Sequence, residues 1–495
     1  MTNLSEQTVF IKSTASIDIT EPAAGTEIAG MAMAGASMTV LQVMISVFIA
    51  YYYTNIAGIG AAAVGTLLLV AKIAEAFSDL GMAAAIPGTK SRWGQARPWG
   101  LRLALPLFVS VALVFWVPEN WGGAAKTAYA CVTYLLMTSA AIAPAGIAGA
   151  VLGTNVTVNQ KSRQKMAVLF SMLTMAGSVF SNIAVLKITQ SLGDGYYAWR
   201  IVAVIFGAFA LVGQLAQFLL TRERIAATRQ APSSAAPNEP RQTRDSGSDG
   251  ATSPAPEPAS TNASIKFQLP ALLKNKYFII MCAVGALTAL DGAMAGCIVY
   301  YVKYVLNNMD LVGVLGVVTL VSMAAGIALA PLASKKVSAK KLMLAGLAIK
   351  TVTLAVNFAI PRSLPLFFGL SALRSFTGAP MMVYCGVFML NTIEYGEYKT
   401  GIRANSLIMS VSSVSNKIGA GFGGALIGWL LGLGGYDGAA ATQGALAQQM
   451  IAIIYFLAPL IASAIAFALL HLYKLDKEYD GVAAALKARK LRDAV

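Results

Sequence analysis

Charged residues, histidine and cysteine are scarce in this sequence. Only 12% of the 495 residues are charged, and the single histidine, His471, lies at the end of an apolar run. No zinc-ligand spacing, nucleophile elbow or Walker loop occurs, so neither a membrane enzyme nor an ATP-driven pump is indicated, and we expect no catalytic residues, metal or cofactor. The cysteines fall inside apolar runs, where reduced cysteine acts as a small hydrophobic residue, and this excludes a disulfide scaffold. They are Cys131, Cys282, Cys297 and Cys385.

Apolar residues, by contrast, are abundant. They make up 57% of the chain, and the mean hydropathy is +0.66, far above the values of soluble proteins. The formal net charge is +15, yet the lysines and arginines are spread between apolar runs instead of covering one solvated face, which excludes a nucleic-acid partner. The polar first 28 residues do not resemble a secretory signal. The composition therefore indicates a multi-pass protein of the lipid bilayer.

Twelve apolar stretches are long enough to cross about 30 Å of hydrocarbon. We expect transmembrane helices at 29–53, 61–86, 101–117, 127–152, 166–187, 199–220, 277–302, 311–333, 342–360, 365–390, 404–432 and 448–473. The only long connection, 221–276, is rich in Ser, Pro and Ala and is predicted to be largely disordered. It separates a half of six spans, 29–220, from a second half, 277–473. This all-α arrangement, with a substrate path between two six-helix halves, is typical of the major facilitator fold.

The loops between the spans predict the orientation, because cytoplasmic loops of membrane proteins carry the excess of Lys and Arg. Arg92 and Arg97 follow the second span and Lys335 follows the eighth, whereas the loops on the other side are short and nearly neutral. The tails 1–28 and 474–495 are then both cytoplasmic. We expect a monomer in the inner membrane of a bacterium.

Seven charged residues fall well inside the predicted spans, away from their ends, where a charge near the bilayer centre costs about 2.5 to 3.5 kcal/mol. They are Lys72, Glu75, Asp79, Asp291, Lys350, Arg374 and Lys417. Lys72, Glu75 and Asp79 share one stripe of the second span, because their spacing is i, i+3, i+7. Two neighbouring carboxylates suit a proton or a small cation, with Lys417 as the ammonium that relieves their repulsion. The alternative is structural charge pairing between helices.

Polar side chains at helical spacing mark further helix faces. Thr39 and Gln42 lie on the first span, Ser171 on the fifth and Ser413 on the eleventh. Such residues also hold membrane helices together, but stripes on several helices favour a central cavity. The candidate substrate-binding residues are Thr39, Gln42, Lys72, Ser171, Asp291, Lys350, Arg374 and Ser413.

The loop after the second span is a candidate conformational gate. Arg92, Arg97 and a turn at Gly94 are predicted to hold the cytoplasmic ends of the second and third spans against the bundle in one access state only. Positive-inside anchoring alone is the alternative.

Two segments resemble a known family. They are "KIAEAFSDLGMAAAIPGTKSRWGQARPW" from Lys72 to Trp99 and "IEYGEYKTGIRANSLIMSVSSVSNKIGAGFGGALIGWLLGLGGY" from Ile393 to Tyr436, reinforced by "YYYT" at 51–54 and "YYVKYVL" at 300–306. They are similar to the glycoside–pentoside–hexuronide:cation symporters, to which melibiose permease belongs. The resemblance implies a cation site at Glu75, Asp79 and Lys417.

Departures from the family pattern bear on the cation and the sugar. Gly146 and Ala143 stand where melibiose-type members carry an acid and a hydroxyl, Thr39 replaces a sugar-binding aspartate, and Ser171 replaces an arginine. Because sodium needs several hard oxygens and a proton needs one carboxylate, we expect proton coupling more than sodium coupling.

The substrate is the least determined point of the sequence. The resemblance implies a glycoside, pentoside or hexuronide, imported or exported by alternating access. The seven charged residues well inside the spans are four cations and three carboxylates, and this excess of one positive charge favours an anionic solute over a neutral sugar. A carrier of amphipathic or lipid-like solutes and a membrane receptor or scaffold without transport remain alternatives.

Overall fold

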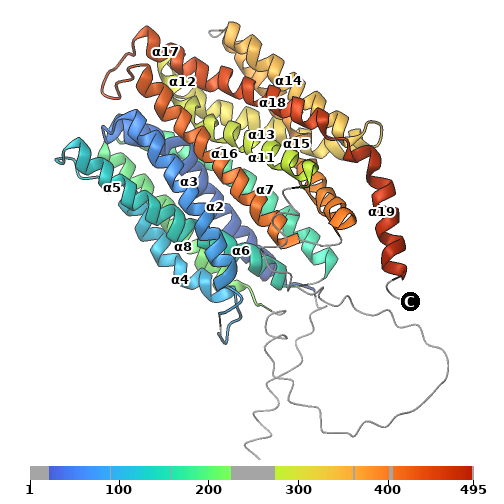
Figure 1. The fold of residues 1–495 in the computed structure, drawn as a ribbon. Helices are drawn as coiled ribbons and strands as arrows, with labels where there is room; N and C mark the ends of the chain where they lie inside the picture. The colour runs from blue at the N-terminus through green and yellow to red at the C-terminus, as the bar shows by residue number, and fades with distance from the viewer. Residues whose placement is uncertain are drawn as a thin grey trace, which may run out of the picture.

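A computed structural model shows the fold as a bundle of long helices (Figure 1). Of the predicted linker 221–276, residues 224–273 lie outside the described residues, as does most of the predicted tail 1–28. No strand occurs in the part of the chain that the structure describes. The described residues are 22–89, 91–157, 159–223, 274–360, 363–400 and 405–492.

The first half contains six spans, and two of them include π-helical turns. The elements are α2 (Gly25–Tyr51) with η1 (Tyr52–Ile56), α3 (Ala61–Ala85), α4 (Arg97–Val114), α5 (Gly123–Leu135) with η2 (Leu136–Ile142) and α6 (Ala143–Asn155), α7 (Gln160–Ser191) and α8 (Tyr196–Leu220). Such π turns widen a helix locally and are frequent at functional sites. Here η2 abuts α3, where the Ser78 hydroxyl donates to the carbonyl of Ser139.

The second half repeats the count and ends with an extra helix. Its elements are α11 (Lys276–Met294) with η3 (Ala295–Cys297) and α12 (Ile298–Tyr304), α13 (Leu311–Ser334), α14 (Ala339–Ala359), α15 (Leu364–Thr400), α16 (Asn405–Leu433), α17 (Ala445–Ala452) with η4 (Ile453–Leu457) and α18 (Ala458–Leu472), and α19 (Leu475–Arg492). The predicted tail 474–495 is therefore mostly α19. This helix buries Leu475, Val482 and Leu486, and Tyr479 donates to Glu394 of α15 at 2.6 Å.

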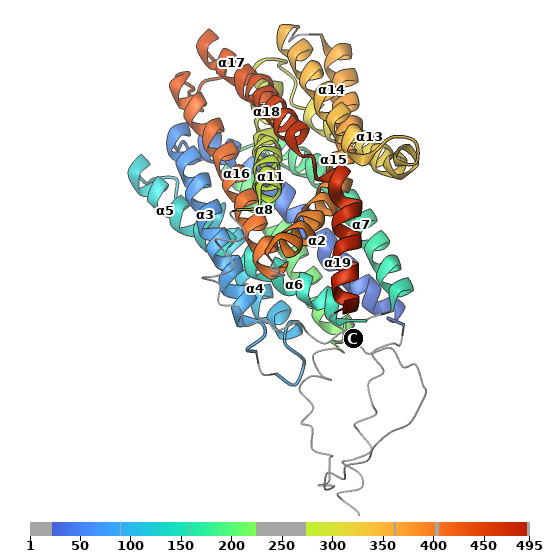
Figure 2. The ribbon, with the colours of Figure 1, turned by 45° about the vertical axis from the view of Figure 1, so that its right-hand side comes forward.

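Eleven of the described helical segments are long and apolar enough to cross a membrane. The predicted eleventh span, α16, is not among them, because polar residues and glycines lower its hydropathy. With 29 residues it is nevertheless about 44 Å long, and it lies beside α3 in the bundle (Figures 1 and 2). With α16 the bundle has the twelve predicted membrane-length helices.

Glycines let α16 pack closely against both halves. A Cβ at Gly423 would lie 2.4 Å from the carbonyl oxygen of Leu290 on α11, and one at Gly428 would lie 2.3 Å from that of Ala61 on α3. Only glycine permits these backbone approaches. The helix is thereby held between the two halves.

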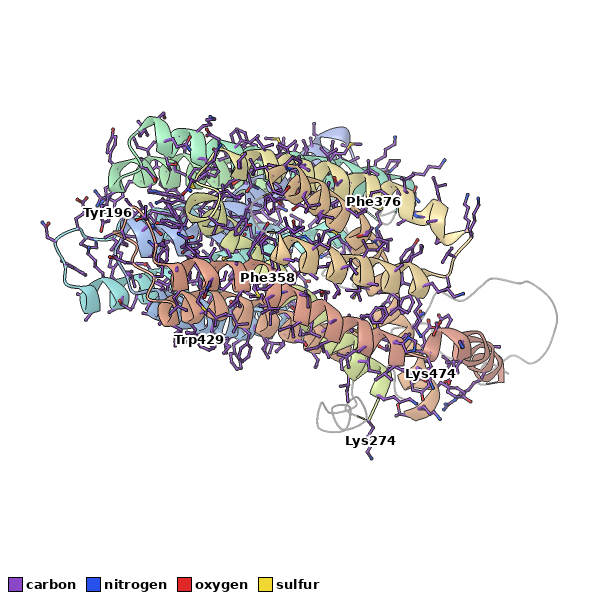
Figure 3. The ribbon with its side chains drawn as sticks, turned by 90° about the horizontal axis from the view of Figure 1, so that it is seen from above. Tyr196, Lys274, Phe358, Phe376, Trp429 and Lys474 are labelled. Carbon is purple, nitrogen blue, oxygen red and sulfur yellow. The ribbon has the colours of Figure 1, made fainter. Side chains whose placement is uncertain are left out.

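The two ends of the bundle differ in composition. We call one the basic end, defined by Arg97, Lys340 and Lys474, and the other the tyrosine end, defined by Tyr51, Tyr300, Tyr304 and Tyr436. Figure 3 shows Tyr196, near the tyrosine end, and Lys474, at the basic end, on opposite sides of the molecule.

Candidate functional site

Lys72, Glu75 and Asp79 lie on one face of α3, and the two carboxylates contact Lys417 of α16. The Lys72 Nζ lies 2.7 Å from Glu75 Oε2. The Lys417 Nζ lies 3.0 Å from Glu75 Oε1 and 2.6 Å from Asp79 Oδ2. The predicted proximity of Glu75, Asp79 and Lys417 is therefore confirmed. Their role in coupling stays a prediction.

This cluster joins the halves through balanced charges. Two carboxylates of the first half, on Glu75 and Asp79, face the ammoniums of Lys72 and Lys417, and Lys417 belongs to the second half. The residue Glu75 is only 8% exposed. Since burying a charge is costly unless it is paired, the loss of one partner would leave an uncompensated charge. Any change of protonation here acts directly on the contact between the halves.

A cavity of about 290 Å³ adjoins the cluster. Lys72 and Glu75 form part of its wall, together with polar groups of Gln42, Tyr134 and Thr138. The cavity lies between α2, α3, the η2 turn, α11 and α16. We call it the coupling cavity.

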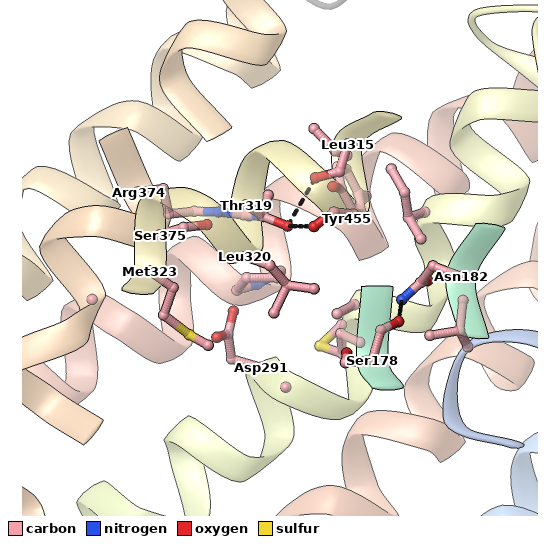
Figure 4. Close-up of a pocket in the computed structure, with 18 of the residues that line it drawn as sticks. Ser178, Asn182, Asp291, Leu315, Thr319, Leu320, Met323, Arg374, Ser375 and Tyr455 are labelled. Carbon is pink, nitrogen blue, oxygen red and sulfur yellow. Dashed lines mark hydrogen bonds between the residues drawn. The ribbon is translucent and has the colours of Figure 1, made fainter. Parts of the chain in front are cut away.

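A second cavity, of about 430 Å³, is lined by three charged residues of the second half. Lys350 of α14 forms an ion pair with Asp291 of α11. The guanidinium carbon of Arg374, on α15, lies 5.8 Å from the centroid of the Tyr455 ring. Figure 4 shows Asp291, Arg374 and Tyr455 around this space, which we call the charged cavity.

The first half contributes to the charged cavity as well. Ser178 and Asn182 of α7 line it, and the Asn182 Nδ2 donates to the Ser178 carbonyl at 2.9 Å (Figure 4). On the other side, Thr319 of α13 donates to the carbonyl of Leu315. Asn182 and Thr319 were not among the substrate-binding residues predicted from the sequence, although Asn182 continues the polar face of Ser171 on the same helix.

A third cavity, of about 520 Å³, lies within the first half towards the basic end. Thr39, Gln42, Gly146 and Arg163 are in its wall. Gln42 also lines the coupling cavity, and Gly292 lines both the coupling and the charged cavities. Neighbouring cavities therefore share wall residues.

Two predicted substrate-binding residues lie outside these cavities. Ser171 is exposed, and Ser413 is half-buried on α16, but neither lines any of the three. The other six are divided among them: Thr39 and Gln42 in the third, Gln42 and Lys72 in the coupling cavity, and Asp291, Lys350 and Arg374 in the charged cavity.

The predicted gate residues make contacts inside the first half. The Arg97 Nε donates to the Phe218 carbonyl of α8 at 2.8 Å, and Arg92 lies over the ring of its neighbour Trp93. Gly94 has a φ of +107°, which favours glycine. The predicted attachment of the second and third spans to the bundle thus has a carbonyl contact at Arg97. Its dependence on the access state stays a prediction.

Glu223, which the sequence did not single out, organises this loop. Its Oε2 accepts from the backbone N–H groups of Ala96 and Arg97 at 2.9 and 3.1 Å, and its Oε1 accepts from Asn155 Nδ2 at 2.8 Å. A carboxylate at a helix N-terminus satisfies free donors and matches the helix dipole. Glu223 therefore fixes the start of α4 to the ends of α6 and α8.

Hydrogen bonds between the halves close the tyrosine end. Thr54 and Tyr300 share a bond of 2.9 Å between their hydroxyls, and the Asn55 Nδ2 donates to the Tyr304 hydroxyl at 2.6 Å. The Tyr436 hydroxyl donates to Asn55 Oδ1 at 2.7 Å, and Lys303 donates to the Tyr51 hydroxyl at 2.8 Å. The clusters of tyrosine near 51–54 and 300–306 were the signal for this contact. From the sequence, these clusters indicated only the family resemblance.

Among the described residues, no group of three or more His, Cys, Asp or Glu side chains is arranged to hold a metal ion.

Known proteins share both the sequence and the fold. The sequence model of the MFS/sugar transport protein family matches residues 30–251 and 242–477. The chain is 29% identical over 403 residues to a glucuronide carrier protein homolog of Escherichia coli strain K12, covering 79% of this chain and 80% of the relative. It is 28% identical over 454 residues to an isoprimeverose transporter of Lactiplantibacillus pentosus, covering 88% and 85%.

Solved structures confirm the predicted fold class. A bacterial homologue of the human lysosomal transporter Spinster has a TM-score of 0.63 at 15% identity, over 90% of this chain and 96% of that one. A D-xylose-proton symporter has a TM-score of 0.57 at 13% identity, over 89% and 96%. The family match over nearly the whole bundle, together with the sequence relatives, establishes that the chain belongs to the glycoside–pentoside–hexuronide:cation symporters of the major facilitator superfamily.

Proposed function

We propose that the protein is a proton-coupled symporter that moves a small organic anion by alternating access between its two halves. The observation that carries this proposal is the position of Lys417. Its ammonium, on the second half, contacts both carboxylates of α3, on the first half. Protonation of Glu75 or Asp79 removes one of these charge pairs, so binding of the coupling ion changes the energy of the interface that must rearrange.

A proton fits this cluster better than sodium does. Both carboxylates are already within 3.0 Å of an ammonium, so a sodium ion would have to displace Lys417 and find further oxygens. Gly146 and Ala143 offer no side-chain oxygen for that purpose. A proton needs only one carboxylate.

The substrate is assigned to the charged cavity. Relatives of this chain have names that refer to a glucuronide, to isoprimeverose and to a glycoside. Arg374 there can bind a carboxylate with two parallel charge-assisted hydrogen bonds. A hexuronide supplies such a carboxylate together with hydroxyl groups.

We also propose that the basic end faces the cytoplasm, because Lys and Arg concentrate in its loops. Both ends of the described chain lie there, at residue 22 before α2 and residue 492 in α19. With the tyrosine end closed, this arrangement would block access from the outside.

Uptake into liposomes with purified protein tests the coupling. An imposed pH gradient should drive accumulation of a uronide, and a sodium gradient at constant pH should not. Asp79→Asn should abolish accumulation and leave downhill exchange partly intact, since exchange does not require the proton to leave. Uptake that follows sodium and ignores pH contradicts the proton assignment.

A thermal-shift screen at two pH values tests the substrate class. Uronates should stabilise the protein more than neutral sugars, other organic anions and lysolipids do. Stabilisation by lysolipids alone would support a lipid carrier. Absence of counterflow for every candidate would favour a scaffold.

A further inference from the structure

The charged cavity holds one carboxylate and two cations. Asp291, Lys350 and Arg374 all line it, and they come from α11, α14 and α15. Their formal charges sum to +1. Because these side chains are largely shielded from water, the cavity cannot rely on solvent to screen an unmatched charge.

The two cations are in different situations. Lys350 is paired with Asp291. Among the residues that the structure describes, Arg374 forms no ion pair within 4 Å, and its guanidinium lies over the ring of Tyr455. The single positive charge of the cavity is therefore located at Arg374.

We infer that Asp291 determines the charge selectivity of this cavity: by neutralising Lys350, it restricts the site to solutes with one negative charge. The inference rests on the proposed function, which places an anionic substrate here. A dianion would have to take Lys350 away from Asp291, leaving a half-buried carboxylate unpaired. A neutral solute would leave Arg374 without a counter-charge. Both are disfavoured, and this is how an unpaired charge creates specificity.

The uncharged wall suits a solute with several hydroxyl groups. The Asn182 Nδ2 donates to the Ser178 carbonyl, and the Oδ1 of this wall residue is available as an acceptor. Thr319 uses its hydroxyl hydrogen on a backbone carbonyl and can still accept. The volume of about 430 Å³ lies in the range of small-ligand pockets. The ligand class is therefore a polyhydroxylated monoanion.

A charge series of probes of similar size tests the inference. Purified wild type is compared by thermal shift and by binding calorimetry with methyl glucoside (neutral), methyl glucuronide (one charge) and glucarate (two charges). Wild type should prefer the monoanion. Asp291→Asn raises the cavity charge to +2 and should shift the preference towards glucarate by roughly tenfold or more, as expected when a like-charge contact is removed.

Two further variants separate charge from structure. Asp291→Asn combined with Lys350→Gln restores a charge of +1 without a buried unpaired group, and it should regain the preference for the monoanion. Lys350→Gln alone gives a charge of zero and should weaken both anions. Ser375→Ala, which changes the same wall without changing its charge, should keep the wild-type order of the three probes.

The outcomes distinguish the inference from the function on which it rests. If wild type binds the monoanion best but Asp291→Asn keeps that order, the selectivity role of Asp291 is wrong and the anionic substrate stands. If Asp291→Asn does not fold and the double variant prefers glucarate, the charge count is wrong. If wild type prefers the neutral probe or binds none of the three, the anionic substrate is wrong, and the inference fails with it.

Discussion

At the scale of single residues, Lys417 contributes most to the site, because one ammonium satisfies two carboxylates. We predict that Lys417→Gln lowers the free energy of unfolding by about 1 to 3 kcal/mol, less than a fully buried pair would lose because these side chains are partly exposed. Thermal unfolding of the purified protein measures this. Lys336→Gln, on an exposed loop, is the control and should have no effect. Equal unfolding temperatures for both variants would contradict the prediction.

Glu223 gives a second prediction at this scale. Glu223→Ala removes the acceptor at the start of α4 and should destabilise the protein by about 1 to 2 kcal/mol, the usual cost of a lost helix cap. Glu223→Gln keeps one acceptor oxygen for the same N–H groups and should lose less. Thermal unfolding compares the two. Equal destabilisation of the Gln and Ala variants would show that the negative charge of Glu223, and not its acceptor oxygen, stabilises the start of α4.

How much of the site the sequence predicted depends on whether its residues share a helix. Lys72, Glu75 and Asp79 follow one helical period, so their common face could be predicted. Lys417 could be assigned to them because a charged residue inside a membrane span needs a partner of opposite charge. Glu223 was not predictable, because its partners Ala96 and Asn155 belong to other helices and no periodicity relates them.

At the scale of elements, the apolar runs predicted every span, but the local breaks were not visible. The π turns and the 3₁₀ turn at 295–297 depend on packing between helices, which apolar periodicity does not encode. The predicted span 365–390 is in fact α15, which continues to Thr400 because α19 packs against its polar end. The predicted third span, 101–117, begins at Arg97, where Glu223 binds the first N–H groups.

Close packing of α16 leads to a third prediction. A methyl group at Gly423 would meet the Leu290 carbonyl, so Gly423→Ala must push α16 away from α11 and should cost about 1 to 3 kcal/mol, as overpacking does. Gly386→Ala, in the middle of α15, is the matched control, because nothing lies within 4 Å of its added Cβ. It should be neutral or slightly stabilising. Unfolding temperatures in detergent test the pair, and a stable Gly423→Ala variant would show that the helices do not pack this closely.

At the scale of the whole molecule, two halves were predictable from the long polar connection, but the closed end was not. Asn55 contacts Tyr304, Gly438 and Tyr436 of the other half. We predict that Asn55→Ala, which removes these three hydrogen bonds, weakens closure by about 2 to 3 kcal/mol, at a usual net value of about 1 kcal/mol for each bond. A cysteine at Val47, in the wall of the charged cavity, should then react faster with a membrane-impermeant maleimide added at the tyrosine end.

The control for this variant removes a bond at the same end within one half. Among the described residues, the Asn308 side chain makes one hydrogen bond, which it accepts from the Asp310 N–H, so Asn308→Ala should leave the labelling rate unchanged. Equal rates for Asn55→Ala and wild type would mean that the tyrosine end is not held by these bonds.

We predict that Asp194 makes the same closure sensitive to pH. It lies in the loop between α7 and α8, accepts from Tyr51 and Trp199, and is connected through Tyr51 to Lys303 of the other half. Burial raises the pKa of Asp194 above its ordinary value of 3.8, although the two hydrogen bonds and the charge of Lys303 oppose this. An opened, hydrated end would return the pKa towards the ordinary value. The closed end therefore binds the proton more tightly, so acid favours closure, and raising the pH through the window above 3.8 favours opening.

The measurement uses the labelling of the Val47→Cys reporter, without the native cysteines, between about pH 4 and pH 7, where carboxyl groups with raised pKa values titrate. Thiol reactivity itself rises with pH, so the rate is divided by that of the same reporter carrying Asp194→Asn, which cannot ionise at this position. We expect this ratio to increase with pH. The amide introduced by Asp194→Asn can still accept one of the two hydrogen bonds, so the comparison tests the charge of Asp194 more than its contacts. A ratio that does not change with pH would show that protonation of Asp194 is not coupled to the closed end.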